Sequence, residues 1–99
     1  MEVNFGDDQL DRLETDPGFT AGLPQQIVTA FRKRMQIIRS APDEREFYKF
    51  KSLHFEKLKG ARKHQHSMRL NDRQRLILEF IKQKQGGKII KIMGIEDYH

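Results

Sequence analysis

The sequence predicts an α+β fold in which N-terminal helices pack on one face of a small, mostly antiparallel β-sheet. Three patterns support this prediction: an apolar stripe at helical spacing in residues 23–39, a hairpin pattern in residues 64–81, and a strongly apolar segment at residues 88–95. Helices followed by a run of strands are typical of folds that place the helices on one side of a sheet. A chain of 99 residues supports one modest core, so we expect a single domain over residues 1–99.

The N-terminal part is expected to contain a short edge strand at residues 3–5 and a short helix at residues 7–14. A longer helix opens at Leu23-Pro24, because proline is tolerated in a first helical turn. We expect its apolar stripe to pack on the sheet, and a helix lying on a membrane surface is the less favoured alternative. The stripe consists of Ile27, Val28, Phe31, Met35 and Ile38.

The hairpin pattern consists of two alternating runs on either side of Asn71-Asp72, a pair that suits a tight turn. Side chains alternate between the two faces of a strand, so one face is expected to close the core and the other to stay open and positively charged. The core face would contain Met68, Leu70, Leu76, Leu78 and Phe80. The open face would contain Ser67, Arg69, Arg73, Arg75 and Glu79, with Ile77 among them.

The remaining segments are less uniform. Residues 43–50 suit a helix or a strand, and residues 53–60 are expected to connect into a strand. Residues 82–87 contain paired glycines and predict a polar turn. Residues 88–95 are apolar on both faces, which is expected of a strand in the interior of the sheet.

Charge is distributed unevenly along the chain. Residues 1–20 contain one basic and six acidic residues, a balance of −5, and residues 21–99 contain 18 basic and 8 acidic residues, a balance of +10. A positive body of this size attracts polyanions, because neutralising phosphates releases counterions. The charge alone therefore fits either a nucleic-acid-binding protein or an ordinary basic domain.

Composition excludes several classes of protein. The chain has no cysteine, which excludes disulfides and thiolate metal sites and is consistent with a reducing compartment. No apolar run approaches a membrane span and the N-terminus lacks the layout of a signal peptide, so we expect a cytoplasmic protein without a membrane partner. Phosphate-binding loops, dinucleotide fingerprints, serine elbows and paired-histidine metal helices are also missing.

Histidine, lysine and arginine side chains are the candidates for chemistry. Cleavage of RNA without a metal needs a group that removes the 2′-OH proton, a cation that stabilises the phosphorane, and an acid that protonates the leaving 5′-oxygen. Histidine suits the two proton transfers, and arginine or lysine suits the charge stabilisation. The candidates are His54, Lys57, Lys59, Arg62, His64, His66, Arg69, Arg75 and the C-terminal Asp97-Tyr98-His99.

Structural explanations compete with these roles. His66 could face the core beside Met68, and Arg69 with Arg75 could form an ordinary solvated face. A metal site is a weaker alternative, since no carboxylate or cysteine lies at metal-motif spacing from the histidines. That site would use His54, His64, His66 and His99.

Three stretches resemble the HigB branch of the RelE/ParE superfamily, the toxins of bacterial type II toxin–antitoxin systems: Leu58-Lys59-Gly60, residues 67–80, and the terminal Glu96-Asp97-Tyr98-His99. The resemblance implies a microbial RNase or RelE-like fold that cuts mRNA in the ribosomal A site, with no metal or other cofactor. It also implies a helix-turn-helix antitoxin as partner, so that operator DNA is reached only through the antitoxin.

The resemblance also implies roles for individual residues. His54 matches a family histidine, although three residues separate it from Leu58, a longer spacing than in the relatives, so Lys57 or Lys59 could hold the lysine role. The catalytic set would be His54, Lys59, Arg75, Asp97, Tyr98 and His99. RNA contacts are expected from Lys57, Arg62, Arg69 and Arg73.

Other functions remain open at this point. The superfamily also contains toxins that poison DNA gyrase, and the charge fits a non-catalytic nucleic-acid-binding module equally well. The apolar helix face could also serve a purely structural partner. Damage to DNA with intact mRNA would distinguish the gyrase poison from the endoribonuclease.

Overall fold

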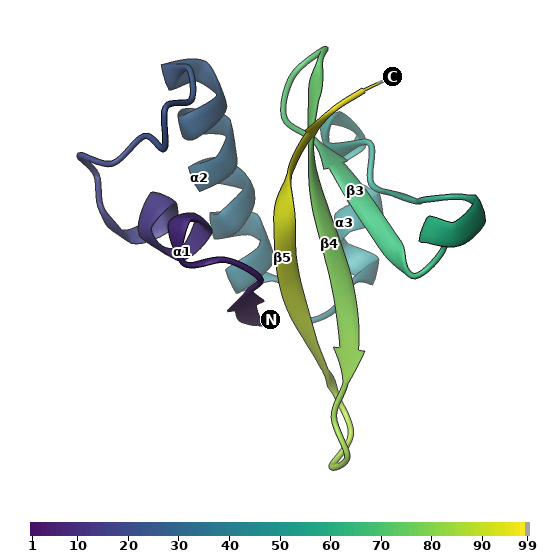
Figure 1. Ribbon diagram of the computed structural model, residues 1–99. Coiled ribbons are helices and arrows are strands. Elements are labelled where there is room, and N and C mark those ends of the chain that lie inside the picture. Colours follow the sequence, from purple (N-terminus) through teal and green to yellow (C-terminus); the bar gives the residue numbers. More distant parts are fainter. Residues whose placement is uncertain (99) are drawn as a thin grey trace.

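The computed structural model describes residues 1–98 and shows helices packed on one face of a five-stranded, mostly antiparallel sheet (Figure 1). The expected α+β class is therefore confirmed. The helices are α1 (Asp8–Thr15), α2 (Gln25–Ser40) and α3 (Arg45–Lys49), and two short 3-10 helices span Lys51–Leu53 and Gly60–Arg62. The strands are β1 (Glu2–Phe5), β2 (Glu56–Lys57), β3 (Gln65–Arg69), β4 (Gln74–Lys82) and β5 (Lys88–Asp97).

The strands lie in the order β1-β5-β4-β3-β2. β1 runs parallel to β5, and every other neighbouring pair is antiparallel. β5 is thus an interior strand, as its apolar character on both faces predicted. The turn between β4 and β5 projects at one end of the molecule, while the chain leaves β5 at the opposite end, beside the turn between β3 and β4 (Figure 1).

Helix α2 closes the core as expected. Its five stripe residues are at most 2% exposed and share one cluster with the apolar side chains of β3, β4 and β5. Burial of each such side chain stabilises the fold by roughly 1.5–3 kcal/mol, so packing rather than helix propensity fixes α2 on the sheet. No helix among residues 1–98 has the length and apolar character needed to cross a membrane.

The turn between β3 and β4 is one residue wider than the Asn71-Asp72 pair suggested. The amide N–H groups of Arg73 and Gln74 both donate to Asn71 Oδ1, at 2.9 and 2.7 Å, and the N–H of Leu70 donates to the Gln74 carbonyl at 2.8 Å. In this turn the side-chain oxygen of Asn71 accepts from two backbone N–H groups that have no partner in the β3–β4 ladder. Arg69 then lies directly opposite Arg75.

Residues 43–60 contain structure that the sequence left open. The ambiguous segment forms α3, with Phe47 fully buried, and the expected connector contains the two-residue edge strand β2. Glu56 pairs with Ser67, and Lys57 pairs with His66. A strand of two residues is too short for an alternating pattern to reveal it.

A β-bulge in β5 changes which side chains face which way. Ile77 pairs with Gly94 and Leu78 pairs with Ile92, so Met93 is the extra residue. Ile90 and Ile92 point into the core before the bulge, and Ile95 packs against the core after it. Glu96 therefore lies opposite Arg75 on the outer face, away from the helices.

The expectation that the outer face is open was wrong in part. Ser67 and Ile77, which lie on that face, are 0% and 1% exposed. Leu58 is also buried. The guanidinium of Arg62 bonds to Gln65 on β3 and to Glu96 on β5, so the Arg62 side chain crosses β4, which lies between these two strands. The β2 segment and the following 3-10 helix thus cover the middle of the outer face.

Candidate functional site

A charged groove lies on the outer face beside the covering segment. It consists of two adjoining hollows of about 350 and 280 Å³ that share Glu56. Arg75 belongs to one hollow and Tyr98 to the other, and their side chains touch. The groove is lined by His54, Glu56, Lys57, Leu58, Lys59, Arg62, Arg69, Asp72, Arg75 and Tyr98.

Arg75 and Tyr98 meet at the centre of the groove. The Arg75 Cζ atom lies 5.2 Å from the centre of the Tyr98 ring, and the Tyr98 N–H donates to the Arg73 carbonyl at 2.8 Å, which extends the β4–β5 ladder. Arg75 forms no ion pair with residues 1–98, and its buried Nε has no hydrogen-bond partner there. A guanidinium in this state is ready to bind an anion.

The Tyr98 hydroxyl holds its proton firmly. Burial raises the pKa of Tyr98, and the nearby Glu56 carboxylate raises it further, although Arg75 and Arg69 act in the opposite direction. The phenol is therefore protonated at neutral pH and can donate a hydrogen bond or a proton.

His54 reaches the groove from an unusual backbone position. It ends the first 3-10 helix with φ 45° and ψ 48°, which is left-handed geometry that side chains with a Cβ rarely adopt. Its Nε2 lies 3.4 Å from Arg69 Nη1. A guanidinium only donates, so Nε2 is the accepting nitrogen in this contact and its lone pair points at Arg69.

Arg69 is held from several sides. Its Nη2 donates to the Asp72 carboxylate and its Nε donates to the Asn71 carbonyl at 3.3 Å. These acceptors offset the repulsion that two arginines at opposite strand positions would cause, since Arg75 lies directly across. Arg69 thus fixes His54 rather than offering a free cation.

Glu56 is a groove residue that the sequence analysis missed. It lies opposite Ser67 on the outer face, and it is exposed with no hydrogen bond or ion pair to residues 1–98. No sequence pattern marked it, because the two residues of β2 are too few to show an alternation. A free carboxylate beside His54 and Tyr98 can accept a proton.

The lysines and Arg62 form the far wall. Lys59 and Lys57 are exposed there, with Lys57 at the rim because its strand partner His66 faces the helix side. Arg62 is already occupied: it forms two bonds of 2.8 and 2.7 Å with Glu96, which raise its pKa, and one of 2.9 Å with Gln65. Arg62 therefore links β3 to β5 and is not an open phosphate site.

Arg73 and Asp97 lie outside the groove. Both line a hollow of about 600 Å³ between the start of α2 and the end of the β3–β4 hairpin, where Gln74 Nε2 donates to Asp97 Oδ1 at 3.2 Å. The bulge at Met93 sends Asp97 to the helix side and Tyr98 to the outer side. Tyr98 lies at the border and lines both this hollow and the groove. His99 lies outside the described residues.

His66 faces the helices. Its ring stacks on Phe55 at 5.1 Å between centroids and meets Phe80 edge-on at 5.1 Å. The structural explanation of this residue is therefore the right one. Within residues 1–98, no group of three or more His, Cys, Asp or Glu side chains is arranged to hold a metal ion.

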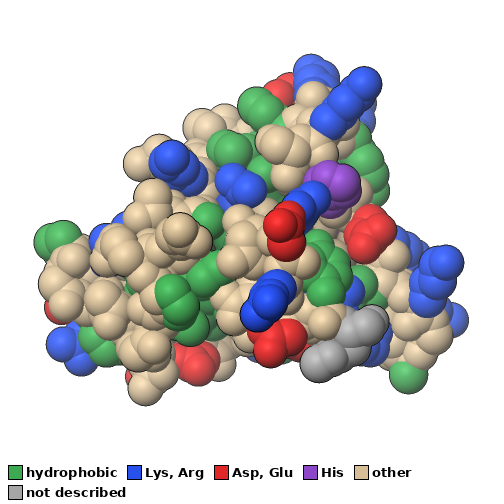
Figure 2. All heavy atoms as spheres, turned by 90° about the horizontal axis from the view of Figure 1, so that it is seen from above, with side chains coloured by type: hydrophobic (Ala, Val, Ile, Leu, Met, Phe, Trp, Pro, Cys, Tyr) green, Lys and Arg blue, Asp and Glu red, His purple; other side chains and the backbone are tan. Residues whose placement is uncertain are grey.

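Figure 2 looks down on the end of the molecule where the chain leaves β5. It shows a histidine with basic and acidic side chains gathered around it, and further Lys and Arg side chains project around the margin of this face. Charge of both signs is thus concentrated at this end.

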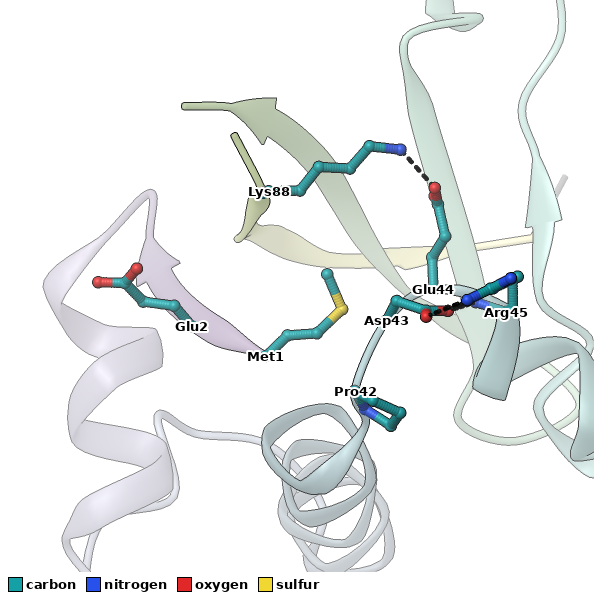
Figure 3. A pocket seen from close by; sticks show the side chains of 8 residues that line it. Met1, Glu2, Pro42, Asp43, Glu44, Arg45 and Lys88 are labelled. Atoms are coloured by element: carbon teal, nitrogen blue, oxygen red, sulfur yellow. Dashed lines mark hydrogen bonds and ion pairs between the residues drawn. The ribbon is translucent and has the colours of Figure 1, made fainter. Parts of the chain in front are cut away.

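A further hollow, of about 530 Å³, lies between the N-terminus and the loop after α2 (Figure 3). Four of its ionic side chains are paired, since Lys88 pairs with Glu44 and Arg45 pairs with Asp43 at 2.8 Å. Arg45 hydrogen bonds lower the pKa of Asp43 to about 2. The hollow lacks the histidine, tyrosine and unpaired arginine found in the groove.

Comparison with known proteins shows the family and the fold of the chain. Among solved structures, a YoeB/ParE toxin from Agrobacterium tumefaciens aligns over 100% of both chains with a TM-score of 0.57 and 14% identity, which supports the fold alone. No curated protein sequence matches the chain. A family profile described as a RelE-like toxin of the type II toxin–antitoxin system HigB matches residues 3–96. The chain therefore belongs to the HigB-like family of type II toxins.

Proposed function

We propose that this toxin is a ribosome-dependent mRNA endoribonuclease that inhibits translation. The observation that carries the proposal is the unpaired Arg75 guanidinium over the Tyr98 ring, with Glu56 and the His54–Arg69 pair in the same groove. Such a groove supplies an anion site, a proton acceptor and a proton donor next to one another. These are the three groups that cleavage of a phosphodiester beside a 2′-OH requires.

The reaction proceeds through attack of the 2′-oxygen on the adjacent phosphorus. The O–H bond of the 2′-hydroxyl breaks as the new P–O bond forms, and the bond to the 5′-oxygen breaks with its electron pair. The products are a 2′,3′-cyclic phosphate and a 5′-hydroxyl. Each well-placed acid or base contributes roughly 10²–10⁴-fold to the rate.

The residues take distinct roles in this proposal. Arg75 holds the scissile phosphate, and Lys59 with Lys57 contacts the neighbouring phosphates. Glu56 accepts the 2′-OH proton, or His54 Nε2 does so after exchanging its contact with Arg69 for the 2′-OH. The protonated Tyr98 hydroxyl or His99 supplies the proton to the 5′-oxygen. Arg69 positions His54, and Arg62 holds the wall of the groove in place.

A type II toxin has an antitoxin counterpart. We assign that role to a helix-turn-helix protein that inhibits the toxin and carries it to operator DNA. Ribosome and mRNA are the remaining partners in the proposal, and the basic character of the body, +10 over residues 21–99, favours their approach.

The test is cleavage of mRNA in a purified translation system, with the new ends mapped on ribosomes. Arg75→Ala should lower the rate by roughly 10²-fold or more, the usual effect of removing a preorganised charge that stabilises a transition state. Arg73→Ala is the matched control, because it removes an arginine two positions away that lines a different hollow. It should lower the rate far less.

Two results would contradict the proposal. Equal rates for the parent protein and Arg75→Ala would remove the groove from the reaction. Intact mRNA together with a DNA damage response in cells that express the toxin would identify a gyrase poison instead.

A further inference from the structure

Two of the three large apolar side chains that are most exposed among residues 1–98 are two residues apart in the sequence, one on α3 and one directly after it. Tyr48 is 60% exposed and Phe50 is 44% exposed. An exposed aromatic pair is informative, because such side chains usually mark a surface that binds a partner. We call Tyr48 and Phe50 the aromatic pair.

The ring of Tyr48 packs on the ring of Phe55. The two rings meet edge-on with 4.9 Å between centroids, and the fully buried Phe47 contacts Phe55 at 5.2 Å. Phe55 in turn stacks on His66. This packing holds the Tyr48 ring in place, so the side chain loses little conformational entropy when a ligand binds to it.

Basic residues flank the aromatic pair, and one of them is unpaired. Residues 45–51 contain Arg45, Lys49 and Lys51 against Glu46, and Arg45 is paired with Asp43. Glu46 pairs with Lys49 at 2.9 Å, whereas Lys51 is exposed and forms no ion pair with the described residues. Aromatic side chains that alternate with lysines suit a single-stranded nucleic acid, whose bases stack while its phosphates meet the cations.

The aromatic pair lies next to the groove. Phe55, the ring under Tyr48, stands between His54 and Glu56, and both of these line the groove. β2 is the edge of the sheet, so the groove and the aromatic pair lie on two sides of a single short strand. A strand of RNA that crosses the groove can pass around this edge.

We propose that Tyr48 and Phe50 form a stacking subsite for unpaired bases of the RNA that flank the scissile phosphate. The inference rests on the proposed function, since it takes the groove to be occupied by RNA. Lys57 on the edge strand and Lys51 in the 3-10 helix before it contact the phosphates between the two sites. The subsite binds bases by their flat faces and therefore tolerates any sequence.

The experiment measures binding of a short, fluorescein-labelled single-stranded RNA whose 2′-hydroxyls are methylated, so that it cannot be cleaved. Leucine at both positions keeps apolar surface but removes the flat rings. The double variant Tyr48→Leu/Phe50→Leu should bind this RNA about tenfold more weakly, in line with the loss of base stacking. Tyr48→Phe should retain the affinity of the parent, and so should Ile81→Ala, which changes the third exposed apolar side chain.

A second measurement maps photochemical cross-links from 4-thiouridine in the same RNA. Cross-links at Tyr48 or Phe50 should persist in Arg75→Ala, because base stacking at the subsite does not require the arginine that acts in cleavage. Parent-like affinity of a folded double leucine variant, or no RNA binding by the parent protein, would overturn the subsite. Loss of cleavage in Arg75→Ala together with parent-like binding of the leucine variant would leave the proposed function standing and remove the subsite alone.

Discussion

The Arg75 guanidinium lies over the ring of Tyr98, with 5.2 Å between Cζ and the ring centre. Arg75 is on β4 and Tyr98 directly follows β5, and the bulge at Met93 is the reason that the two side chains share a face. Contacts of this kind contribute about 0.5–1 kcal/mol at exposed sites and more when water is excluded. The ring thus places the guanidinium while its hydroxyl stays available in the groove.

Replacing Tyr98 with phenylalanine tests the hydroxyl. Tyr98→Phe keeps the ring under Arg75 and removes the O–H, so the rate of mRNA cleavage should fall by roughly 10²-fold or more if the phenol transfers a proton. Single-turnover cleavage on programmed ribosomes would measure this. A parent-like rate for Tyr98→Phe, with a large loss for Tyr98→Leu, would instead assign Tyr98 a purely packing role.

Glu56 is expected to control the titration of Tyr98. The Glu56 carboxylate raises the pKa of Tyr98, so Glu56→Gln should lower that pKa, because the phenolate no longer faces a negative charge. Ultraviolet titration in a Tyr48→Phe background would follow Tyr98 alone. Glu46→Gln, on α3 and paired with Lys49, is the matched control and should leave the titration unchanged. An identical curve for Glu56→Gln would show that the two groups do not interact.

The fold could be predicted because long, regular patterns specify it. The apolar stripe of α2, the alternation in β3 and β4 and the apolar character of β5 each extend over enough residues to select one structure. The parts that were missed are short. Neither the two residues of β2 nor the five of α3 extend far enough to set a period.

The groove could be predicted only in part, for a geometric reason. Simple alternation from the buried Ile92 would place Asp97 beside Arg75 and send Tyr98 to the helix side. The extra residue at Met93 reverses this, and nothing in a single sequence marks a bulge at a methionine. Charge pairing was equally hidden, so Arg62 and Arg69 could not be distinguished from the unpaired Arg75.

The left-handed backbone of His54 is expected to lower the stability of the fold while it places the imidazole in the groove. Its left-handed backbone costs a residue with a Cβ about 1–2 kcal/mol, a cost that glycine avoids. His54→Gly should therefore be more stable than His54→Ala by about 1 kcal/mol, while both lose most of the cleavage activity. Urea denaturation of the two variants provides the comparison. Equal stability would mean that the backbone relaxes when the imidazole is removed.

Acid sensitivity of the fold is expected to come partly from His66. Burial among the aromatic rings lowers the pKa of His66 below its ordinary value of 6.5, with Lys57 and Lys88 acting in the same direction and Glu44 opposing them. The unfolded chain therefore binds a proton more readily than the folded chain. This contribution to stability is fully present above pH 6.5 and is lost as the pH falls through the lowered pKa.

The variant His66→Phe keeps a ring between Phe55 and Phe80 and removes the titration. Its free energy of unfolding should decline less than that of the parent protein as the pH falls below 6.5. His64→Gln, which removes an exposed histidine just before β3, should follow the parent curve. Urea unfolding at several pH values measures all three proteins, and a parallel decline of His66→Phe and the parent would assign the acid sensitivity to other groups.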